Sequence, residues 1–219
     1  SQAIEWKVSG MGANPADPID SFNIEPHKAR YLSDDELRRL MESLDQSTSV
    51  HLKSLVLFLL ATGARRGEAL KARWSEIDFD KQEWYLPDTK SGKPHWIPLN
   101  EAALGVLDQI PRVSGSDHVF ADPKTGEPHK HLFSSFDRAR KRAGLPHVRI
   151  HDLRHTFASR LVNSGRSLVE VQKLLNHQDY STTLRYAHLQ SNTLQEATTI
   201  AAQSMGSVFN GVAGHLADS

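Results

Sequence analysis

The sequence predicts a fold of the α+β class that is mainly α-helical and carries a small antiparallel β-sheet. Apolar residues recur at helical spacing in most segments between residues 33 and 175. Two short segments, EWYLP and HWIPL, are instead rich in aromatic and branched residues and are bounded by turn residues, as in a hairpin. The 219 residues, of which 38% are apolar, are enough for one sizeable core.

The composition narrows the class of protein. Cysteine is absent, which excludes a disulfide framework and a thiolate metal site and is typical of a reducing compartment. No apolar run has the length of a membrane span, and no signal-peptide pattern opens the chain. We therefore expect a soluble, cytoplasmic protein with no membrane partner.

The formal net charge is zero, but the charges are unevenly distributed along the chain. Residues 124–166 contain ten Lys and Arg against three Asp and Glu, a net charge of +7, whereas the other segments are slightly acidic. Such a run is most often a solvated basic face. Because this one includes the phosphate-type residues described below, it favours a footprint for a polyanion.

The first 26 residues lack periodicity and hold several Gly and Pro residues, which predicts a linker or arm that follows a further domain upstream. At Ser33 the segment S-D-D-E has the pattern of a capping box with Glu36, and an apolar stripe after it predicts a helix. The stripe consists of Leu37, Leu40, Met41 and Leu44. Residues 52–60 are apolar on all sides, which predicts a central buried helix that stops at Gly63.

A cation follows this buried helix almost directly. One helix ends at Gly63 and another begins near Arg66, so Arg65 lies on the turn between them. Turns beside a core normally carry small or polar residues, which makes a cation there unusual. Two interpretations stay open: Arg65 pairs with Glu68, or Glu68 holds its helix in place while Arg65 points at a ligand.

The two predicted strands are joined by DTKSGK, which places Lys90 in the turn of a hairpin. A turn lysine is usually just solvated, but one on a β-hairpin can also reach into a DNA groove. Asn100 then predicts the cap of a helix over 101–110, and residues 111–130 predict loops. A basic amphipathic helix follows over 132–143. Its cationic residues, which we expect to contact phosphates, are Arg138, Arg140, Lys141 and Arg142.

The segment from 147 to 186 is the most informative about function. Its first part predicts a helix that begins near residue 152 and stops at Gly165, because apolar residues recur there every four positions. These residues are Leu153, Phe157 and Leu161. His151 and Arg154 lie near the start of this helix, at a spacing that puts them on neighbouring faces.

A second helix is predicted over 167–175, with Asn176 as a left-handed cap, so His177 emerges just past a helix end. Three hydroxyls at 181–183 offer N-cap oxygens for one more short helical turn, which carries Tyr186. A weaker helical pattern follows, and the last fourteen residues predict a flexible tail.

Six residues in these positions carry side chains that can act on a phosphate, namely Arg65, Lys90, His151, Arg154, His177 and Tyr186. They occur in the contexts T-G-x-R-x-x-E, T-K-x-G-K before I-P-L, H-x-x-R-H and N-H-x8-Y. In this order the motifs resemble those of the tyrosine recombinase, or phage integrase, family over about residues 31–189. The segment KARYLSDDELRRLM is especially similar to the start of the catalytic domain in prophage and genomic-island integrases. The family usually has glycine where this chain has Asn176, which also tolerates the left-handed conformation.

The resemblance implies a tyrosine recombinase catalytic-domain fold over residues 27–189. Residues 1–26 would then be the linker or arm from an upstream DNA-binding domain, and 190–219 a C-terminal helix and tail. The implied function is site-specific DNA recombination, for the integration or excision of a mobile element such as a prophage.

In that chemistry Tyr186 attacks a DNA phosphodiester, forming a 3′-phosphotyrosyl bond and freeing a 5′-hydroxyl. A phenol with a pKa near 10 is only about one part in a thousand ionised at neutral pH, so neighbouring groups must help. The resemblance implies that Arg65 and Arg154 grip the non-bridging oxygens and that Lys90 protonates the leaving oxygen.

The other implied roles surround these three. His151 is expected to assist proton handling at the tyrosine, and His177 to hydrogen-bond the phosphate. Glu68 and His155 are expected to hold the site from behind, and Lys93 to contact DNA. No metal, nucleotide or other cofactor is required.

The implied partners are double-stranded DNA attachment sites, on which recombinases of this family assemble as tetramers around two DNA partners. An isolated catalytic domain is expected to be monomeric in solution, and a DNA-bending accessory protein is a further expected partner. Two alternatives stay open. One is a type IB topoisomerase, which would relax DNA without exchanging partners, and the other is a DNA-binding regulator that has lost cleavage.

A metal site and a second nucleophile are two further alternatives. His147, His151 and His155 are four apart, which is a metal-ligand spacing. The predicted helix begins only after the second of them, so the three do not share a helical face, and the chain has no H-E-x-x-H pattern. Tyr180 lies three residues after His177, outside the spacing that matches the family. Phosphoryl transfer through a tyrosine further along the chain is therefore the favoured hypothesis.

Overall fold

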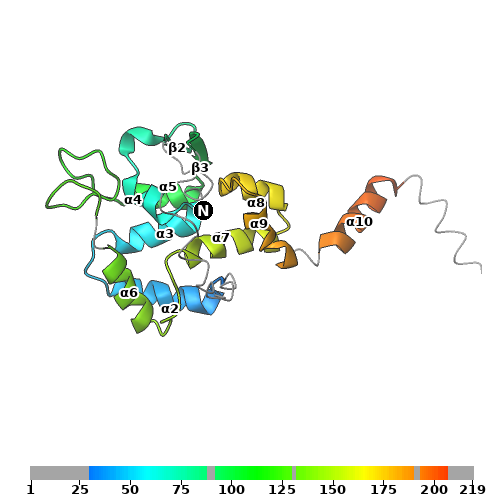
Figure 1. Cartoon of the computed structure of the whole chain (residues 1–219), viewed down its shortest axis with the longest axis horizontal. Coiled ribbons are helices and arrows are strands. Elements are labelled where there is room, and N and C mark those ends of the chain that lie inside the picture. The colour runs from blue at the N-terminus through cyan, green and yellow to red at the C-terminus, as the bar shows by residue number, and fades with distance from the viewer. Residues whose placement is uncertain (1–29, 88–91, 130–131, 190–192, 207–219) are drawn as a thin grey trace, which may run out of the picture.

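The fold is arranged around helix α3 (Leu52–Thr62), which is apolar on nearly every side. The computed structural model describes residues 30–87, 92–129, 132–189 and 193–206. In it α3 packs against α2 (Asp34–Asp45), α4 (Arg66–Lys71), α5 (Glu101–Asp108), α6 (Leu132–Arg142) and α7 (Asp152–Asn163). Figure 1 shows α3 between these helices, so the central buried helix predicted from the sequence is confirmed.

The capping box predicted at Ser33 is present at the start of α2. The Ser33 hydroxyl accepts a hydrogen bond from the Glu36 backbone N–H at 3.2 Å, and the Glu36 carboxylate accepts one from the Ser33 N–H at 3.0 Å. Leu40 and Leu44 are buried against the core. The reciprocal cap satisfies two of the donors that the first turn of a helix leaves free, which explains why α2 begins at Asp34.

A three-stranded antiparallel sheet of β1 (Ile77–Asp78), β2 (Glu83–Leu86) and β3 (His95–Pro98) packs on α3 through Trp84. Trp84 pairs with Ile97 across the predicted hairpin, and both side chains point into the core. The ring centroid of Trp84 lies 5.4 Å from that of Phe58 on α3. Strand β1 was not predicted. It has two residues after the short 3₁₀ turn η1 (Trp74–Glu76), too few to show a pattern.

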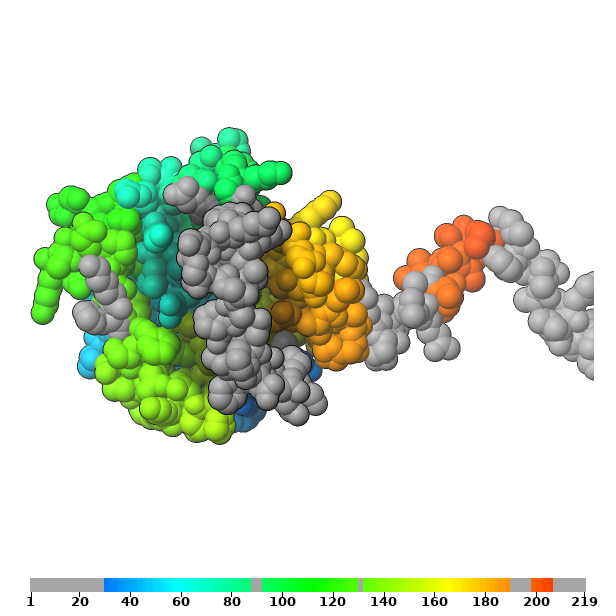
Figure 2. All heavy atoms as spheres, viewed as in Figure 1, coloured from blue at the N-terminus to red at the C-terminus, as the bar shows by residue number. Residues whose placement is uncertain are grey.

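The C-terminal part forms a second, smaller apolar cluster between α7, α8 (Leu168–Leu174) and the residues after α9 (Ser181–Leu184). After the 3₁₀ turn η2 (Ala187–Leu189), helix α10 (Thr193–Ser204) stands clear of the other helices, as the space-filling view in Figure 2 also shows. Among the described residues, no helix combines the length and apolarity needed to cross a bilayer.

Two predicted boundaries were wrong. The helix predicted over 101–110 ends at Asp108, because Gln109 and Ile110 donate instead to carbonyls three residues back in a tighter turn. Helix α9 ends before Tyr186, and none of the hydroxyls at 181–183 caps it. The Asp179 carboxylate accepts from the Ser181 N–H at 2.8 Å, so an acidic residue upstream takes the place of the predicted caps.

Three predictions fall on residues outside those described: the linker or arm at 1–26, the turn that carries Lys90, and the tail after 206. The division of the chain into a linker, a catalytic domain and a C-terminal segment also stays a prediction.

The turn after α3 depends on Gly63. Its φ is +66°, and a Cβ built there would lie 2.3 Å from Phe157 Cδ1 and 2.9 Å from Leu175 Cδ2. We expect Gly63→Ala to lower the free energy of unfolding by about 2–4 kcal/mol, since left-handed strain of about 1 adds to overpacking of about 1–3. Urea denaturation followed by circular dichroism measures this change.

Gly165→Ala is the matched control for that substitution. Gly165 has a φ of +85°, but no atom lies within 4 Å of the site where its Cβ would be. The Gly165→Ala variant should therefore lose only about 1 kcal/mol of its free energy of unfolding, from the left-handed backbone strain. Equal losses in the two variants would show that packing at Gly63 is not the cause.

Candidate active site

The site forms where the turn after α3, the first turns of α7 and the segment after α8 meet. Arg65 Nη2 donates to the Asn176 carbonyl at 3.2 Å, across 111 residues of sequence. Arg154 Nη1 donates to the Gly63 carbonyl at 2.7 Å, and its Nη2 donates to the Leu175 carbonyl. The two arginines therefore tie the three segments together with main-chain hydrogen bonds.

Arg154 is the more buried of the two guanidinium groups, with 4% of its surface exposed. Burial, followed by the positive charge of Arg65, lowers the pKa of Arg154 to about 10, while Glu68 and Tyr186 act in the opposite direction. The group is still protonated at neutral pH. Two carbonyls use two of its five N–H donors, which leaves it able to bind an anion as well.

Arg65 lies just before α4 and is held by Glu68. The Glu68 carboxylate accepts one hydrogen bond from Arg65 Nη1 at 2.7 Å and another from the Arg65 backbone N–H at 2.8 Å. The Arg65 side chain remains 31% exposed. The pairing of Arg65 with Glu68, one of the two interpretations of the sequence, is therefore present. Part of the Arg65 guanidinium is still exposed to solvent.

His177 follows directly on the left-handed residue Asn176, whose φ is +49° as predicted for the cap. Its Nδ1 lies 2.8 Å from the hydroxyl of Thr183, which links the loop after α8 to helix α9. Burial and then the charges of Arg154 and Arg65 lower the pKa of His177 to about 3. The imidazole is therefore neutral at pH 7.

Tyr186 lies inside the domain. Only 2% of its surface is exposed, because its ring packs in the second apolar cluster with residues such as Val162 and Val171. Burial raises the pKa of Tyr186 to about 12, although the charges of Arg185 and Arg154 lower it. The predicted nucleophile is thus a protonated, enclosed phenol that lies within the field of Arg154.

The hydroxyl of Tyr186 is hydrogen-bonded to His155, whose Nδ1 lies 2.5 Å away. His151, which we expected to assist the tyrosine, lies exposed at the start of α7. Its ring meets that of His155 edge to face, with centroids 4.8 Å apart. His155 was predicted only to support the site, although its position next to Arg154 and one turn after His151 was visible in the H-x-x-R-H motif.

The residues predicted to contact DNA differ in how they are held. Lys93, Arg138 and Lys141 are exposed. Arg140 donates to Asp137 and to the Pro146 carbonyl, and Arg142 donates to the hydroxyl of Ser43 at 3.0 Å and to its carbonyl. The last two arginines therefore also join α6 to its surroundings, and the DNA contacts stay predictions.

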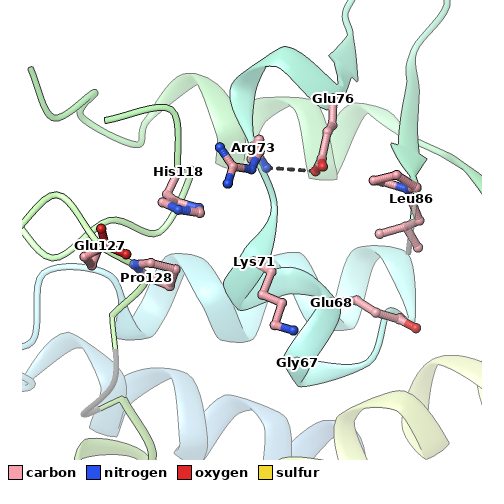
Figure 3. Close-up of a pocket in the computed structure, with 10 residues that line it drawn as sticks. Gly67, Glu68, Lys71, Arg73, Glu76, Leu86, His118, Glu127 and Pro128 are labelled. Atoms are coloured by element: carbon pink, nitrogen blue, oxygen red, sulfur yellow. Dashed lines mark hydrogen bonds between the residues drawn. The ribbon is translucent and has the colours of Figure 1, made fainter. Parts of the chain in front are cut away.

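A cleft of about 500 Å³ opens between α4, η1 and the loop around residues 118–128 (Figure 3). Lys71 and Arg73 line it together with Glu76 and Glu127, so its walls carry both signs of charge. Of the predicted site residues that the structure describes, only Glu68 lines the cleft. Arg65 and Arg154 therefore converge outside this cleft. Nor do any three metal-ligating side chains come together within the described ranges.

The buried histidine predicts how stability depends on pH. Burial and then the neighbouring His151 lower the pKa of His155 from 6.5 to about 4. Between these pH values the unfolded chain binds more protons than the folded one. The stability that the neutral His155 contributes is therefore complete above pH 6.5 and is lost as the pH falls to about 4. His155 alone should account for a loss of at most about 3 kcal/mol.

Urea denaturation between about pH 7 and about pH 4 measures this loss. His155→Asn is the control, because asparagine does not titrate in this range and should flatten the dependence. An unchanged slope in the variant would assign the dependence to other groups, of which His177 is the first candidate.

Comparison with known proteins supports the family resemblance predicted from the sequence motifs. Residues 30–193 match the Phage integrase family. The integrase of Escherichia phage 186 is 29% identical over 199 residues, which are 90% of this chain and 54% of that protein. The chain spans about half the length of the first curated relatives it matches.

Solved structures agree with the predicted fold. The catalytic domain of bacteriophage HP1 integrase has a TM-score of 0.62 at 29% identity, over 80% of this chain and 96% of that one. A lambda integrase dimer bound to a COC′ core site has a TM-score of 0.60 at 25% identity, over 74% of this chain and 60% of that one. The mainly helical fold with a small antiparallel sheet is confirmed.

Proposed function

Because the chain belongs to the phage integrase family, we propose that it is a site-specific recombinase that cleaves and rejoins DNA strands through a 3′-phosphotyrosyl bond on Tyr186. The observation that carries the proposal is the convergence of two guanidinium groups from distant segments, Arg65 and Arg154, with the charge of the second acting to lower the pKa of the Tyr186 phenol.

The two arginines can stabilise the negative charge that develops during phosphoryl transfer. As the phenol oxygen bonds to phosphorus and the P–O5′ bond breaks, negative charge grows on the two non-bridging oxygens. Guanidinium groups bind such oxygens with paired N–H donors, and donors of this kind are each worth about 3–4 kcal/mol. Arg65 and Arg154 are held in place before DNA arrives, so the site loses little energy in reorganising.

Protons must also move. With a pKa of about 12, only about one Tyr186 phenol in 10⁵ is ionised at pH 7, so the proton leaves as the new bond forms. The leaving O5′ must gain a proton, and Lys90 is the proposed donor. Attack by a 5′-hydroxyl of a second strand reverses both transfers and releases the tyrosine. His177, neutral in this structure, is the proposed hydrogen-bond donor to the phosphate.

The proposed partner is duplex DNA carrying an attachment site, bound by several copies of the chain. The lambda integrase neighbour is a dimer on a core site, which supports assembly on DNA. Arg138 and Lys141, exposed on α6, are proposed phosphate contacts. Binding should therefore weaken as salt rises, because each phosphate contact releases counterions.

Nicked duplexes that tile both junctions of the element carrying this gene provide the test. Each nick lets the short 5′ fragment diffuse away after cleavage, so a covalent protein–DNA adduct accumulates and is seen on a denaturing gel. We expect an adduct on a narrow set of duplexes, in the presence of EDTA. DNA binding without any adduct would overturn the proposal in favour of a regulator. An adduct with plasmid relaxation but no joining between duplexes would favour a topoisomerase.

A further inference from the structure

The contact between Tyr186 and His155 has no part in the chemistry described so far. It joins the first turn of α7 to a residue 31 positions later, and both side chains are almost fully buried, with 2% and 5% of their surfaces exposed. The distance from Nδ1 to the phenol oxygen is 2.5 Å. Because the rings lie in a dry environment, this hydrogen bond is stronger than an exposed one and fixes where the hydroxyl points.

The direction of the hydrogen bond follows from the charges around it. Burial, and then the charges of His151, Arg185, Arg154 and Arg149, lower the pKa of His155 and keep its imidazole neutral. The phenol is neutral too. A phenol O–H is a better donor than a neutral imidazole N–H, so the hydroxyl donates and Nδ1 accepts.

We propose that His155 is a positioning residue for the nucleophile: its Nδ1 accepts the hydrogen bond of the Tyr186 hydroxyl and sets the orientation from which the phenol oxygen attacks. The inference rests on the proposed function. His151, stacked edge to face on His155 and exposed, is left free to face the DNA. The two histidines of the motif thus have different tasks, one inside the domain and one at its surface.

His155 orients the phenol and does not remove its proton outright. The pKa values of the two groups, about 4 and about 12, lie too far apart for a stable transfer between them. The hydrogen bond to His155 Nδ1 still fixes the direction of the Tyr186 O–H bond. A lone pair of the phenol oxygen therefore points away from His155. Misplacing a reacting atom by about 1 Å can cost about 10²-fold in rate, so the loss of this acceptor should be visible in the cleavage step.

Two nearly isosteric substitutions test the inference. The amide oxygen of His155→Asn can accept from the phenol at about the same reach as Nδ1, whereas His155→Leu fills a similar volume without an acceptor. Single-turnover adduct formation on the nicked duplex that the wild-type protein cleaves should fall about 10²-fold in the leucine variant. In the asparagine variant it should recover to within about tenfold, with duplex binding equal in both.

A second readout separates positioning from mere packing. The phenol pKa of Tyr186, taken from the ultraviolet difference between each protein and its Tyr186→Phe partner, should change in His155→Leu and stay near the wild-type value in His155→Asn. Wild-type cleavage rates in the leucine variant would overturn the inference, as would equal defects in the two variants. If the wild-type protein forms no adduct on any duplex, the proposed function itself fails.

Discussion

Replacing Tyr186 with phenylalanine is expected to abolish covalent attachment to DNA, lowering the rate of adduct formation by at least about 10⁴-fold. The variant lacks the only oxygen of this side chain that can bond to phosphorus. Its ring should keep its place, because the apolar cluster around residues 158–175 holds the whole ring and not the hydroxyl. Duplex affinity should therefore stay within about twofold, and stability should change by about 1 kcal/mol for the lost hydrogen bond.

Tyr180→Phe is the matched control for this prediction. Tyr180 lies six residues earlier, just before α9, with 41% of its surface exposed. Its hydroxyl is more accessible than that of Tyr186, so it is the better nucleophile if accessibility alone decides. We expect full adduct formation by Tyr180→Phe on a denaturing gel. An adduct that persists in Tyr186→Phe and vanishes in Tyr180→Phe would move the nucleophile to the earlier residue.

The parts of the fold that the sequence predicted well are those set by local rules. The capping box at Ser33, the apolar run of α3 and the left-handed Asn176 each depend on residues within one or two turns. The hairpin of β2 and β3 was visible for the same reason. Strand β1 was missed because its two residues are a strand only by pairing with Trp84 and Glu83.

The site was predictable in composition but not in arrangement. Motif spacing brought out Arg65, Arg154 and His177, and the structure joins their segments through main-chain carbonyls. Spacing could not show which histidine meets Tyr186, because that depends on how α7 and the segment after α9 pack together. Nor could it show that Tyr186 is buried, since tyrosine is intermediate between the residues that are usually buried and those that are usually exposed.

For the basic helix α6, too, the sequence predicted the composition but not the arrangement of the side chains. A run of cations predicts a positive surface, but it does not tell which of them are already engaged. Arg142 reaches Ser43 on α2, and Arg140 reaches the carbonyl of Pro146. Such bonds to neutral oxygens outside α6 leave no trace in the charge pattern, whereas Arg138 and Lys141 are exposed and have their partners Ser135 and Asp137 on α6 itself.

Arg154 should be the most sensitive position after the tyrosine, because one side chain serves both the fold and the chemistry. Its two terminal nitrogens bind the carbonyls of Gly63 and Leu175, and its remaining donors are the proposed ligands of the phosphate. Arg154→Lys keeps the charge, but an ammonium cannot span two carbonyls and a phosphate at once. We expect adduct formation to fall about 10²–10³-fold and the free energy of unfolding to fall by about 1–3 kcal/mol.

Arg160→Lys separates these effects from the general consequence of changing an arginine on α7. Arg160 lies on the same helix, but 48% of its side chain is exposed and its ion-pair partner Asp34 is 88% exposed. Exposed pairs of this kind contribute little, so both the cleavage rate and the stability should be unchanged. If Arg154→Lys loses stability yet cleaves the nicked duplex at the wild-type rate, Arg154 ties the segments together without binding the phosphate. The charge stabilisation would then rest on Arg65, whose guanidinium is held by Glu68 and is still 31% exposed.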